Sequence, residues 1–383
     1  MSRRKKSVER IKNRITSIAK DDGQAQPLGI ATVLHAFSIL YGAVMAIRAR
    51  FYQTGIFPTK SLPCRVVSIG NITAGGTGKT PMTIFVAQTI KKLGYRVVVI
   101  SRGYRGRMEG STGVVSDGRT VLLGPDDAGD EPYLIATALT GIPVVVGSDR
   151  YQAGMLAIDR FSPDIIVLDD AFQHLRLKRD LDLVLLDHHA PLGNGYLLPR
   201  GRLREPTSAL SRAHALVFTR CDVAAGSDPL PRLTYHGPVF HSIHVPVVQS
   251  VSTSNGSSAN EMANFSALKG RTAVAFAGLA DNDQFFASLK QGGCRLVCQL
   301  AFGDHHPYDE KDMQRIFRQA FANDAEILIT TAKDWVKVQP IYRWPLPVVT
   351  VDVRIGWNND SPSFFSFLST ALSNVMKQPS KKN

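Results

Sequence analysis

The chain has 383 residues, of which 44% are hydrophobic, and its formal net charge is +13. This composition is enough for two cores of ordinary size and is neither repetitive nor low in complexity, which excludes repeat and fibrous architectures. Four cysteines are too few for a disulfide framework, and the positive charge is compatible with nucleic acid, an anionic membrane surface or phosphorylated substrates.

The N-terminal region combines a basic segment with an apolar one. Residues 1–28 are polar and basic, and residues 29–47 contain no formally charged side chain. The apolar run is just long enough to span a bilayer. Both of its flanks are basic, however, so a span would place one flank outside, against the positive-inside rule. We expect a membrane-associated helix within 29–57 that lies in the interface; a single span and a core helix remain alternatives.

From residue 65 onward, short β-branched runs alternate with helix-like stretches. This alternation predicts an α/β fold in which a mostly parallel sheet is covered on both faces. After about residue 230 a Ser- and Asn-rich stretch precedes a second set of strands, which predicts a second, smaller α/β domain. The expected parts are a basic extension at 1–28, a membrane-associated helix at 29–57, a P-loop domain at 58–230, a smaller C-terminal α/β domain at 231–375 and a tail at 376–383.

The stretch VVSIGNITAGGTGKTPMTIF is typical of a phosphate-binding loop between a strand and a helix. Glycines let backbone N–H groups turn toward phosphate oxygens, and the helix N-terminus adds a partial positive charge. In this pattern Lys79 contacts the outer phosphates and the Thr80 hydroxyl holds Mg²⁺. The first glycine of the usual pattern is replaced by Thr73, which leaves this mechanism intact. The expected nucleotide-binding residues are Thr73, Ala74, Gly75, Gly76, Thr77, Gly78, Lys79 and Thr80.

A second acidic element follows in PDIIVLDDAFQHL, where a buried-looking strand ends in Asp169 and Asp170. A carboxylate presented in this way binds Mg²⁺ directly or through water in P-loop enzymes. The alternative is that the two acids cap a following helix. Gln173 follows closely and is expected to face the same cleft.

Three classes of nucleotide enzyme fit this loop. A partitioning ATPase would have a lysine just before the double glycine, where this chain has Ala74. A GTPase would have [NT]-K-x-D after a later strand; Thr219–Asp222 reads TRCD, with Arg220 in place of the lysine, so guanine binding stays open at this point. The third class is a kinase that acts on a small or lipid acceptor.

Longer motifs favour the third class: SIGNITAGGTGKTP, SRGYRG, GDEPYLIA, GSDRYQAG, LDDAFQHLRLKRDLDLVLLD, GNGYLLPRGRLREP, AGLADNDQFF, FGDHHPY and TAKDWVK. In this order, from about residue 29 to 355, they resemble the tetraacyldisaccharide 4'-kinase family, the lipid A kinases of Gram-negative bacteria. The resemblance implies ATP-dependent phosphorylation of the 4'-hydroxyl of tetraacyldisaccharide 1-phosphate to form lipid IVA in lipopolysaccharide biosynthesis. Residues 1–28 and the loop near 248–262 lie outside it.

The resemblance also implies a catalytic pair. The family's base is similar to Asp130 in GDE, and its orienting histidine is similar to His305 in FGDHH, with the adjacent His306 as an alternative. Lys79 completes the expected catalytic set. A general base has to lie within reach of the acceptor hydroxyl. If Asp130 and His305 lie on different domains, the pair forms only when the two domains close, which would couple catalysis to domain closure. The alternative for Asp130 is an N-cap on the helix that begins at Glu131.

Further residues are assigned with their alternatives. Glu205 is similar to an acid near the metal, so the expected metal set is Thr80, Asp169, Asp170 and Glu205; a surface glutamate before a proline is the alternative. Arginine forks suit a substrate phosphate, but surface arginines are the alternative here. The expected substrate-binding residues are Asn71, Arg102, Tyr104, Arg150 and Gln173. The TAKDWVK motif receives no chemical role.

The expected co-substrate is ATP, the expected metal is Mg²⁺, and the expected partners are a lipid substrate and a membrane surface. We expect no nucleic acid and no obligate protein partner. The resemblance implies a peripheral or monotopic location on the cytoplasmic face of the bacterial inner membrane. The alternative function is a membrane-associated P-loop GTPase or ATPase that hydrolyses nucleotide to drive a protein partner.

Overall fold

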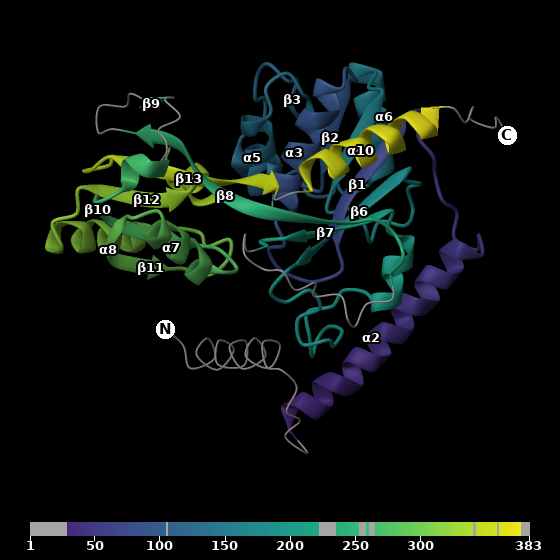
Figure 1. The fold of residues 1–383 in the computed structure, drawn as a ribbon, viewed down its shortest axis with the longest axis horizontal. Coiled ribbons are helices and arrows are strands. Elements are labelled where there is room, and N and C mark those ends of the chain that lie inside the picture. Colours follow the sequence, from purple (N-terminus) through teal and green to yellow (C-terminus); the bar gives the residue numbers. More distant parts are fainter. Residues whose placement is uncertain are drawn as a thin grey trace.

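The computed structural model describes most of the chain, as two α/β parts that are connected through one long strand (Figure 1). The described residues are 29–104, 106–221, 235–252, 258–259, 265–339, 342–357 and 360–376. The basic extension predicted at 1–28, Asp222 of the TRCD motif and most of the tail predicted at 376–383 lie outside them.

The larger part contains the mostly parallel sheet that the β-branched runs predict. Its strands are β1 (Arg65–Asn71), β2 (Val97–Ser101), β3 (Thr112–Ser116), β4 (Val144–Gly147), β5 (Ile165–Asp169), β6 (Leu181–Asp187) and β7 (Ala215–Thr219). Their spatial order is β7-β6-β1-β5-β2-β4-β3. Only β3, at the edge of this part, runs antiparallel to its neighbour among the described strands here. The strands are buried on both faces, which explains their continuous hydrophobic runs.

Helices cover both faces of this sheet. They are α3 (Lys79–Lys92), α4 (Pro125–Ala128), α5 (Asp130–Ala138), α6 (Arg150–Phe161), the 3₁₀ helix η1 (Thr207–Arg212) and α10 (Ser361–Met376), whereas α2 (Ile30–Gln53) lies outside these layers and is largely exposed. Helices α3, α5 and α10 pack into one hydrophobic cluster on one face. Helix α6 packs into a separate cluster on the opposite face.

The smaller part repeats this architecture, which confirms the predicted second α/β unit as part of the fold class. Its strands are β9 (Ser258–Ala259), β10 (Thr272–Ala277), β11 (Arg295–Ala301), β12 (Ile327–Thr331) and β13 (Val348–Trp357). Its helices are η2 (Phe265–Leu268), α7 (Asn282–Gln291), α8 (Glu310–Ala322) and α9 (Ala332–Val338). Helix α7 covers one face, and α8 and α9 cover the other.

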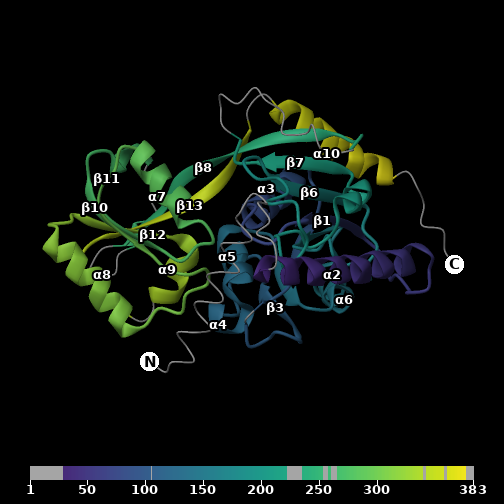
Figure 2. The ribbon, with the colours of Figure 1, turned by 90° about the horizontal axis from the view of Figure 1, so that it is seen from below.

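Strand β8 (Val239–Ser252) connects the two parts. Its first residues pair in parallel with β7, and the rest of the strand pairs antiparallel with β13. In the described residues the two sheets are therefore continuous, and a two-stranded ribbon runs between the parts (Figures 1 and 2).

The chain returns to the larger part at its C-terminal end, which differs from the predicted division. We expected residues 231–375 to form the smaller domain, but α10 packs against the core of the larger part. Its Phe364 is fully buried and lies against Phe85, Phe240 and Trp357. The domain limits otherwise stay a prediction.

Helix α2 is longer than the apolar run that predicts it, and it presents two different sides. One side docks on the larger part: the Ser38 hydroxyl donates to Leu197 O and the Tyr41 hydroxyl to Arg204 O, both in the segment that precedes η1, and the Arg48 guanidinium donates to Gln173 O after β5. Another side carries exposed large apolar residues at helical spacing. These residues are Val33, Phe37, Leu40, Val44 and Ile47. Among the described helices, α2 is the one that is long and apolar enough to cross a membrane, by length and composition alone.

The packing of α10 is tested by Phe364→Ala. Because the ring is fully buried among three aromatic side chains, we expect a loss of about 3–5 kcal/mol in the free energy of unfolding, measured by chemical denaturation. The neighbouring Phe365 is 39% exposed, so Phe365→Ala should cost roughly 1 kcal/mol or less. Equal losses in both variants would contradict the packing described here.

Candidate functional site

The candidate site lies at the carboxyl edge of the larger sheet. Strands β1, β2, β4 and β5 are parallel, so their carboxyl ends meet at the same edge. Asn71, Ser101, Gly147 and Asp169 end these four strands. Ligands of open α/β sheets bind outside this edge.

The loop from Thr73 to Thr80 connects β1 to α3 with the geometry that an anion site requires. Gly78 is the N-cap of α3 with φ +77°, and Gly75 has φ +120°. A side chain at Gly75 would collide with the Arg202 guanidinium, and one at Gly78 with the His244 ring. Within the described residues, the amides of Gly75, Gly76 and Gly78 have no hydrogen-bond acceptor. They are therefore available to phosphate oxygens.

The carbonyl groups of this loop are held by side chains from later strands and loops. Arg202 Nε donates to Ala74 O at 3.0 Å, and Ala74 N donates to Arg202 O at 2.6 Å. The Arg220 guanidinium donates to Gly76 O, and the Thr219 hydroxyl donates to Thr77 O. The first residues of the TRCD motif therefore support the loop backbone.

Lys79 lies beside the predicted acidic pair. Its Nζ is 3.7 Å from Asp170 Oδ1, and Arg204 Nη1 is 3.1 Å from each oxygen of the same carboxylate. Burial raises the pKa of Asp170, but the positive charges of Lys79 and Arg204 outweigh it and hold that pKa below its usual value. Asp170 is thus a fixed anion next to the phosphate loop.

Asp169 has a different environment, although it is the neighbouring residue. Thr83 Oγ1 donates to one of its oxygens at 3.0 Å, and Ser101 Oγ donates to the other at 3.2 Å. Burial, followed by the nearby Glu131 and Asp170 charges, raises the pKa of Asp169. Turns rather than a helix follow the two acids, so the interpretation of this pair as helix caps is wrong.

The other two predicted metal ligands come from different elements than the acidic pair, and their metal role stays a prediction. Thr80 lies in the first turn of α3, and Glu205 Oε2 is 2.5 Å from Arg212 Nη2. The second oxygen of Glu205 is buried and has no hydrogen-bond partner among the described residues. In the part of the chain that the structure describes, no three His, Cys, Asp or Glu side chains could together hold a metal ion.

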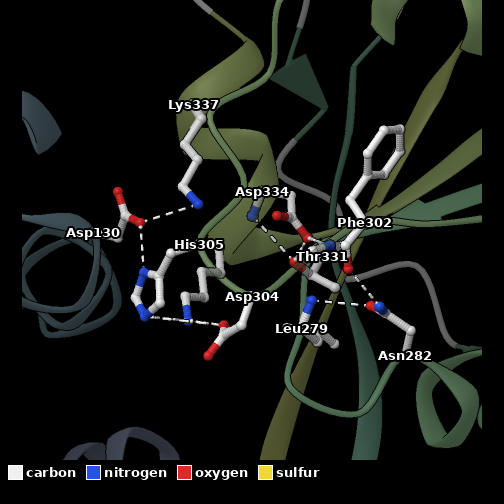
Figure 3. Close-up of polar contacts among 11 residues, drawn as sticks. Asp130, Leu279, Asn282, Phe302, Asp304, His305, Thr331, Asp334 and Lys337 are labelled. Atoms are coloured by element: carbon white, nitrogen blue, oxygen red, sulfur yellow. Dashed lines mark hydrogen bonds and ion pairs between the residues drawn. The ribbon is translucent and has the colours of Figure 1, made fainter. Parts of the chain in front are cut away.

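The two parts of the molecule meet at Asp130 and His305 (Figure 3). His305 Nδ1 is 3.2 Å from Asp130 Oδ2. Asp130 is the first residue of α5, and Gly129 is its N-cap, so the alternative role of Asp130 as an N-cap is wrong. The adjacent His306 instead pairs with Asp312 at 2.7 Å. Of the two histidines, His305 is therefore the one that contacts Asp130.

The predicted substrate-binding residues have different surroundings. Asn71 Nδ2 donates to Thr77 Oγ1 at 2.9 Å, and Gln173 Nε2 donates to Asn71 O at 2.7 Å, so both residues support the phosphate loop. Arg150 is buried and donates to the backbone carbonyls that end β4 and β5, and burial lowers its pKa to about 10. Their substrate contacts stay predictions.

Two further predicted substrate-binding residues are exposed, and one of them lies beside His305. Arg102 and Tyr104 follow β2 and are both exposed. The Tyr104 ring lies edge-on to the His305 ring, with 6.3 Å between their centroids. Tyr104 is therefore an exposed side chain beside the histidine that contacts Asp130, and the substrate contacts of both residues stay predictions.

Sequence reasoning missed the basic side chains around the site. They are Arg202, Arg204, Arg220, Lys333 and Lys337. A local pattern does not reveal them, because each contacts a group that is distant in the sequence. The available signal was their clustering within GRLREP, TRCD and TAKDWVK.

Comparisons with known proteins agree with this geometry. A family model described as tetraacyldisaccharide-1-P 4'-kinase matches residues 30–373. A tetraacyldisaccharide 4'-kinase from Geobacter metallireducens is 47% identical over 312 residues, which are 82% of this chain and 90% of that protein. Another from Pelobacter propionicus is 44% identical over 315 residues, with coverages of 82% and 85%.

A solved structure is similar as well. The crystal structure described as the "apo" form of LpxK from Aquifex aeolicus in complex with ATP is 31% identical, with a TM-score of 0.69. The match covers 90% of this chain and 100% of that chain. The family match over most of the length, together with these relatives, leads to one conclusion: the chain belongs to the tetraacyldisaccharide-1-P 4'-kinase family.

Proposed function

We propose that this protein transfers the γ-phosphoryl group of ATP to the 4'-hydroxyl of tetraacyldisaccharide 1-phosphate, which forms lipid IVA in lipid A biosynthesis. The observation that carries the proposal is the contact between Asp130 and His305, at the carboxyl edge of a sheet that also presents a phosphate loop. A nucleotide hydrolase needs to orient only water, whereas this pair provides a proton acceptor for an alcohol.

The phosphates of the nucleotide would be bound by backbone N–H groups of the phosphate loop and by Lys79. The amides of Gly75, Gly76 and Gly78, which have no acceptor among the described residues, would donate to phosphate oxygens, and the dipole of α3 favours negative charge at its N-terminus. Lys79 is close enough to Asp170 to be held in position without ligand, and it would move onto the outer phosphates as ATP binds. Arg202 and Arg220 donate to carbonyl oxygens of the loop and would hold the loop in a conformation that leaves room for the phosphates.

The residues at the site fit Mg²⁺. This ion prefers hard oxygen ligands and is usually bound by one or two carboxylates together with phosphate oxygens and water. Asp170, the Thr80 hydroxyl and the unpartnered oxygen of Glu205 offer such ligands. Burial is the main cause of the raised pKa of Asp169, and the nearby charges of Glu131 and Asp170 add to it; a bound cation would offset the repulsion among these acids. When bound, Mg²⁺ neutralises charge on the phosphates.

Asp130 would act as the base. Burial raises its pKa, but the hydrogen bond from His305 and the charge of Lys337 outweigh burial, so the net pKa is lowered. The carboxylate is therefore ionised at neutral pH and ready to accept the proton of the acceptor hydroxyl. Tyr104, exposed next to His305, and the exposed Arg102 after β2 would contact the sugar or its phosphate.

Helix α2 would bring the enzyme to its lipid substrate. An acceptor with four acyl chains is costly to remove from the bilayer, so an enzyme on the membrane surface needs to bind only the headgroup. The exposed apolar side of α2 suits insertion at the interface, and its other side is hydrogen-bonded to the protein. We therefore infer an interfacial location, on the cytoplasmic face of the inner membrane where ATP is present.

The transfer is tested with labelled ATP, tetraacyldisaccharide 1-phosphate, detergent and Mg²⁺. Wild-type protein should label the lipid, and Lys79→Ala and Asp130→Asn should each lower kcat by about 10²- to 10⁴-fold. GTP as the donor should support little transfer. Brisk GTP hydrolysis without labelled lipid would instead favour the partner-driving GTPase.

The metal assignment is tested by titrating Mg²⁺. Chelation should abolish transfer, and Asp170→Asn should raise the Mg²⁺ concentration for half-maximal rate at least about tenfold. Asp164→Asn is the matched control, because Asp164 pairs with Arg96 at the start of β5, away from the site. An unchanged Mg²⁺ requirement in Asp170→Asn would remove this residue from the metal set.

The orientation of α2 is tested by the triple variant Phe37→Ser, Leu40→Ser and Val44→Ser. Each fully buried apolar side chain contributes about 1.5–3 kcal/mol, so binding to anionic phospholipid vesicles should fall at least tenfold, as measured by co-sedimentation. Tyr41→Phe lies on the docked side and should leave vesicle binding unchanged. If Tyr41→Phe weakened binding as much as the triple variant did, the proposed orientation would be wrong.

A further inference from the structure

Helix α9, in the TAKDWVK motif, brings two lysines to the Asp130–His305 pair (Figure 3). Lys337 Nζ is 3.1 Å from Asp130 Oδ2. Lys333 Nζ is 3.1 Å from His305 Nε2 and also 3.1 Å from Asp304 Oδ1. Residues four apart on a helix lie on the same side, so one surface of α9 contacts both members of the pair.

The helix that carries these lysines is firmly anchored. Thr331 caps it by accepting from Asp334 N, and the fully buried Asp334 accepts from Gly278 N and from the Thr331 hydroxyl. Trp335 and Val338 are buried in the core of the smaller part. The lysine ammonium groups therefore project from a fixed support, which a positioning role requires.

The Asp130 carboxylate is bound asymmetrically. Both His305 Nδ1 and Lys337 Nζ contact Oδ2. Among the residues that the structure describes, none forms a hydrogen bond or ion pair with Oδ1. One oxygen thus fixes the orientation of the group, and the other is left for the acceptor hydroxyl.

The His305 ring is fixed by its two contacts. A lysine ammonium has only donors, so in the contact with Lys333 the Nε2 atom must be the acceptor. The ring proton is then on Nδ1, which donates to Asp130 Oδ2. His305 also has φ +56°, a left-handed backbone that is uncommon for a residue other than glycine. Backbone and side-chain contacts together give the ring one orientation.

We propose that Lys333 and Lys337 are positioning residues for the reaction: Lys337 aims Oδ1 of Asp130 at the acceptor hydroxyl, and Lys333 selects the Nδ1–H tautomer of His305. This inference rests on the proposed kinase function, and it gives the TAKDWVK motif a role in closing the site. Lys337 contacts Asp130 of the larger part only when α9 lies against α5, whereas Lys333 holds His305 within the smaller part, so the base is fully oriented only in that arrangement.

The charges around Asp130 give the inference a pH signature. Asp130 is faced by Lys337 and His305 from the smaller part, with Lys333 and Asp304 behind the ring. Burial raises its pKa, and His305 and Lys337 lower it to below the ordinary value. Activity that requires ionised Asp130 is therefore lost as pH falls through that lowered pKa. Loss of the Lys337 charge raises the pKa and moves the acid limb to higher pH.

The first test compares the pH profiles of kcat/KM for wild type, Lys337→Met and Lys337→Arg. We expect Lys337→Met to lower kcat about 10- to 100-fold, with little change in KM for ATP, and to shift the acid limb upward. Lys337→Arg should restore most of the rate and the limb. Lys311→Met, an exposed lysine on α8, is the matched control, and circular dichroism checks that each variant is folded.

The second test does not depend on activity. The ¹⁵N resonances of His305, identified by their absence in His305→Gln, report which ring nitrogen carries the proton. Wild type should show the Nδ1–H tautomer, and Lys333→Met should shift the ring toward the Nε2–H tautomer. An unchanged tautomer would overturn the role of Lys333.

The outcomes separate the inference from the proposed function. If wild-type protein phosphorylates the lipid while Lys337→Met keeps its kcat and acid limb, the positioning role is wrong and the kinase function stands. If wild-type protein does not phosphorylate the lipid, the proposed function fails, and the inference that rests on it is overturned as well.

Discussion

The contact between Asp130 and His305 is the constraint on which the site depends. These residues are 175 positions apart in the chain, and they belong to two parts that are connected through the β8–β13 ribbon. Each part has a hydrophobic core of its own, and the end of β13 also packs against the core of the larger part. What joins them at the site is polar and basic: a carboxylate on α5, an imidazole on a loop, and two lysines on α9. Such a contact can form and separate at modest cost, which suits an enzyme that has to admit a bulky lipid headgroup.

A second set of contacts extends from the exposed helix to the nucleotide loop. Ser38 and Tyr41 of α2 bind the segment that ends at Arg204, and this segment pairs with the phosphate loop through the Thr73–Leu203 bridge. Arg204 then holds Asp170, which in turn holds Lys79. The side of the protein that we place on the membrane is therefore continuous with the residues that we expect to bind ATP. The lipid substrate and the nucleotide would meet at the carboxyl edge of the sheet, because the contacts of α2 and the phosphate loop both lead to that edge.

Much of the fold was predictable, because it depends on local patterns. The β-branched runs matched the parallel strands, and the glycine-rich loop preceded a helix as expected. The antiparallel edge strand β3 and the return of α10 were missed, because they depend on which apolar surface remains uncovered once the rest has folded.

For the site, the resemblance pointed to Asp130 and His305. The arginines that hold the loop and the lysines of α9 were missed, since their partners are backbone carbonyls and side chains far away in the sequence. The burial of Arg150 was not predictable from its charge: its guanidinium joins two strand ends, so the surface-arginine alternative is wrong, and its substrate contact stays a prediction.

We propose that Asp130 and His305 act as one unit across the two parts. A double-mutant cycle of Asp130→Asn and His305→Gln, with kcat for phosphate transfer to the lipid as the readout, tests it most directly. Residues that act together are strongly non-additive, so the double variant should be about as slow as the slower single variant. Losses that multiply in the double variant would mean that the two residues act independently, and they would contradict a joint role of Asp130 and His305.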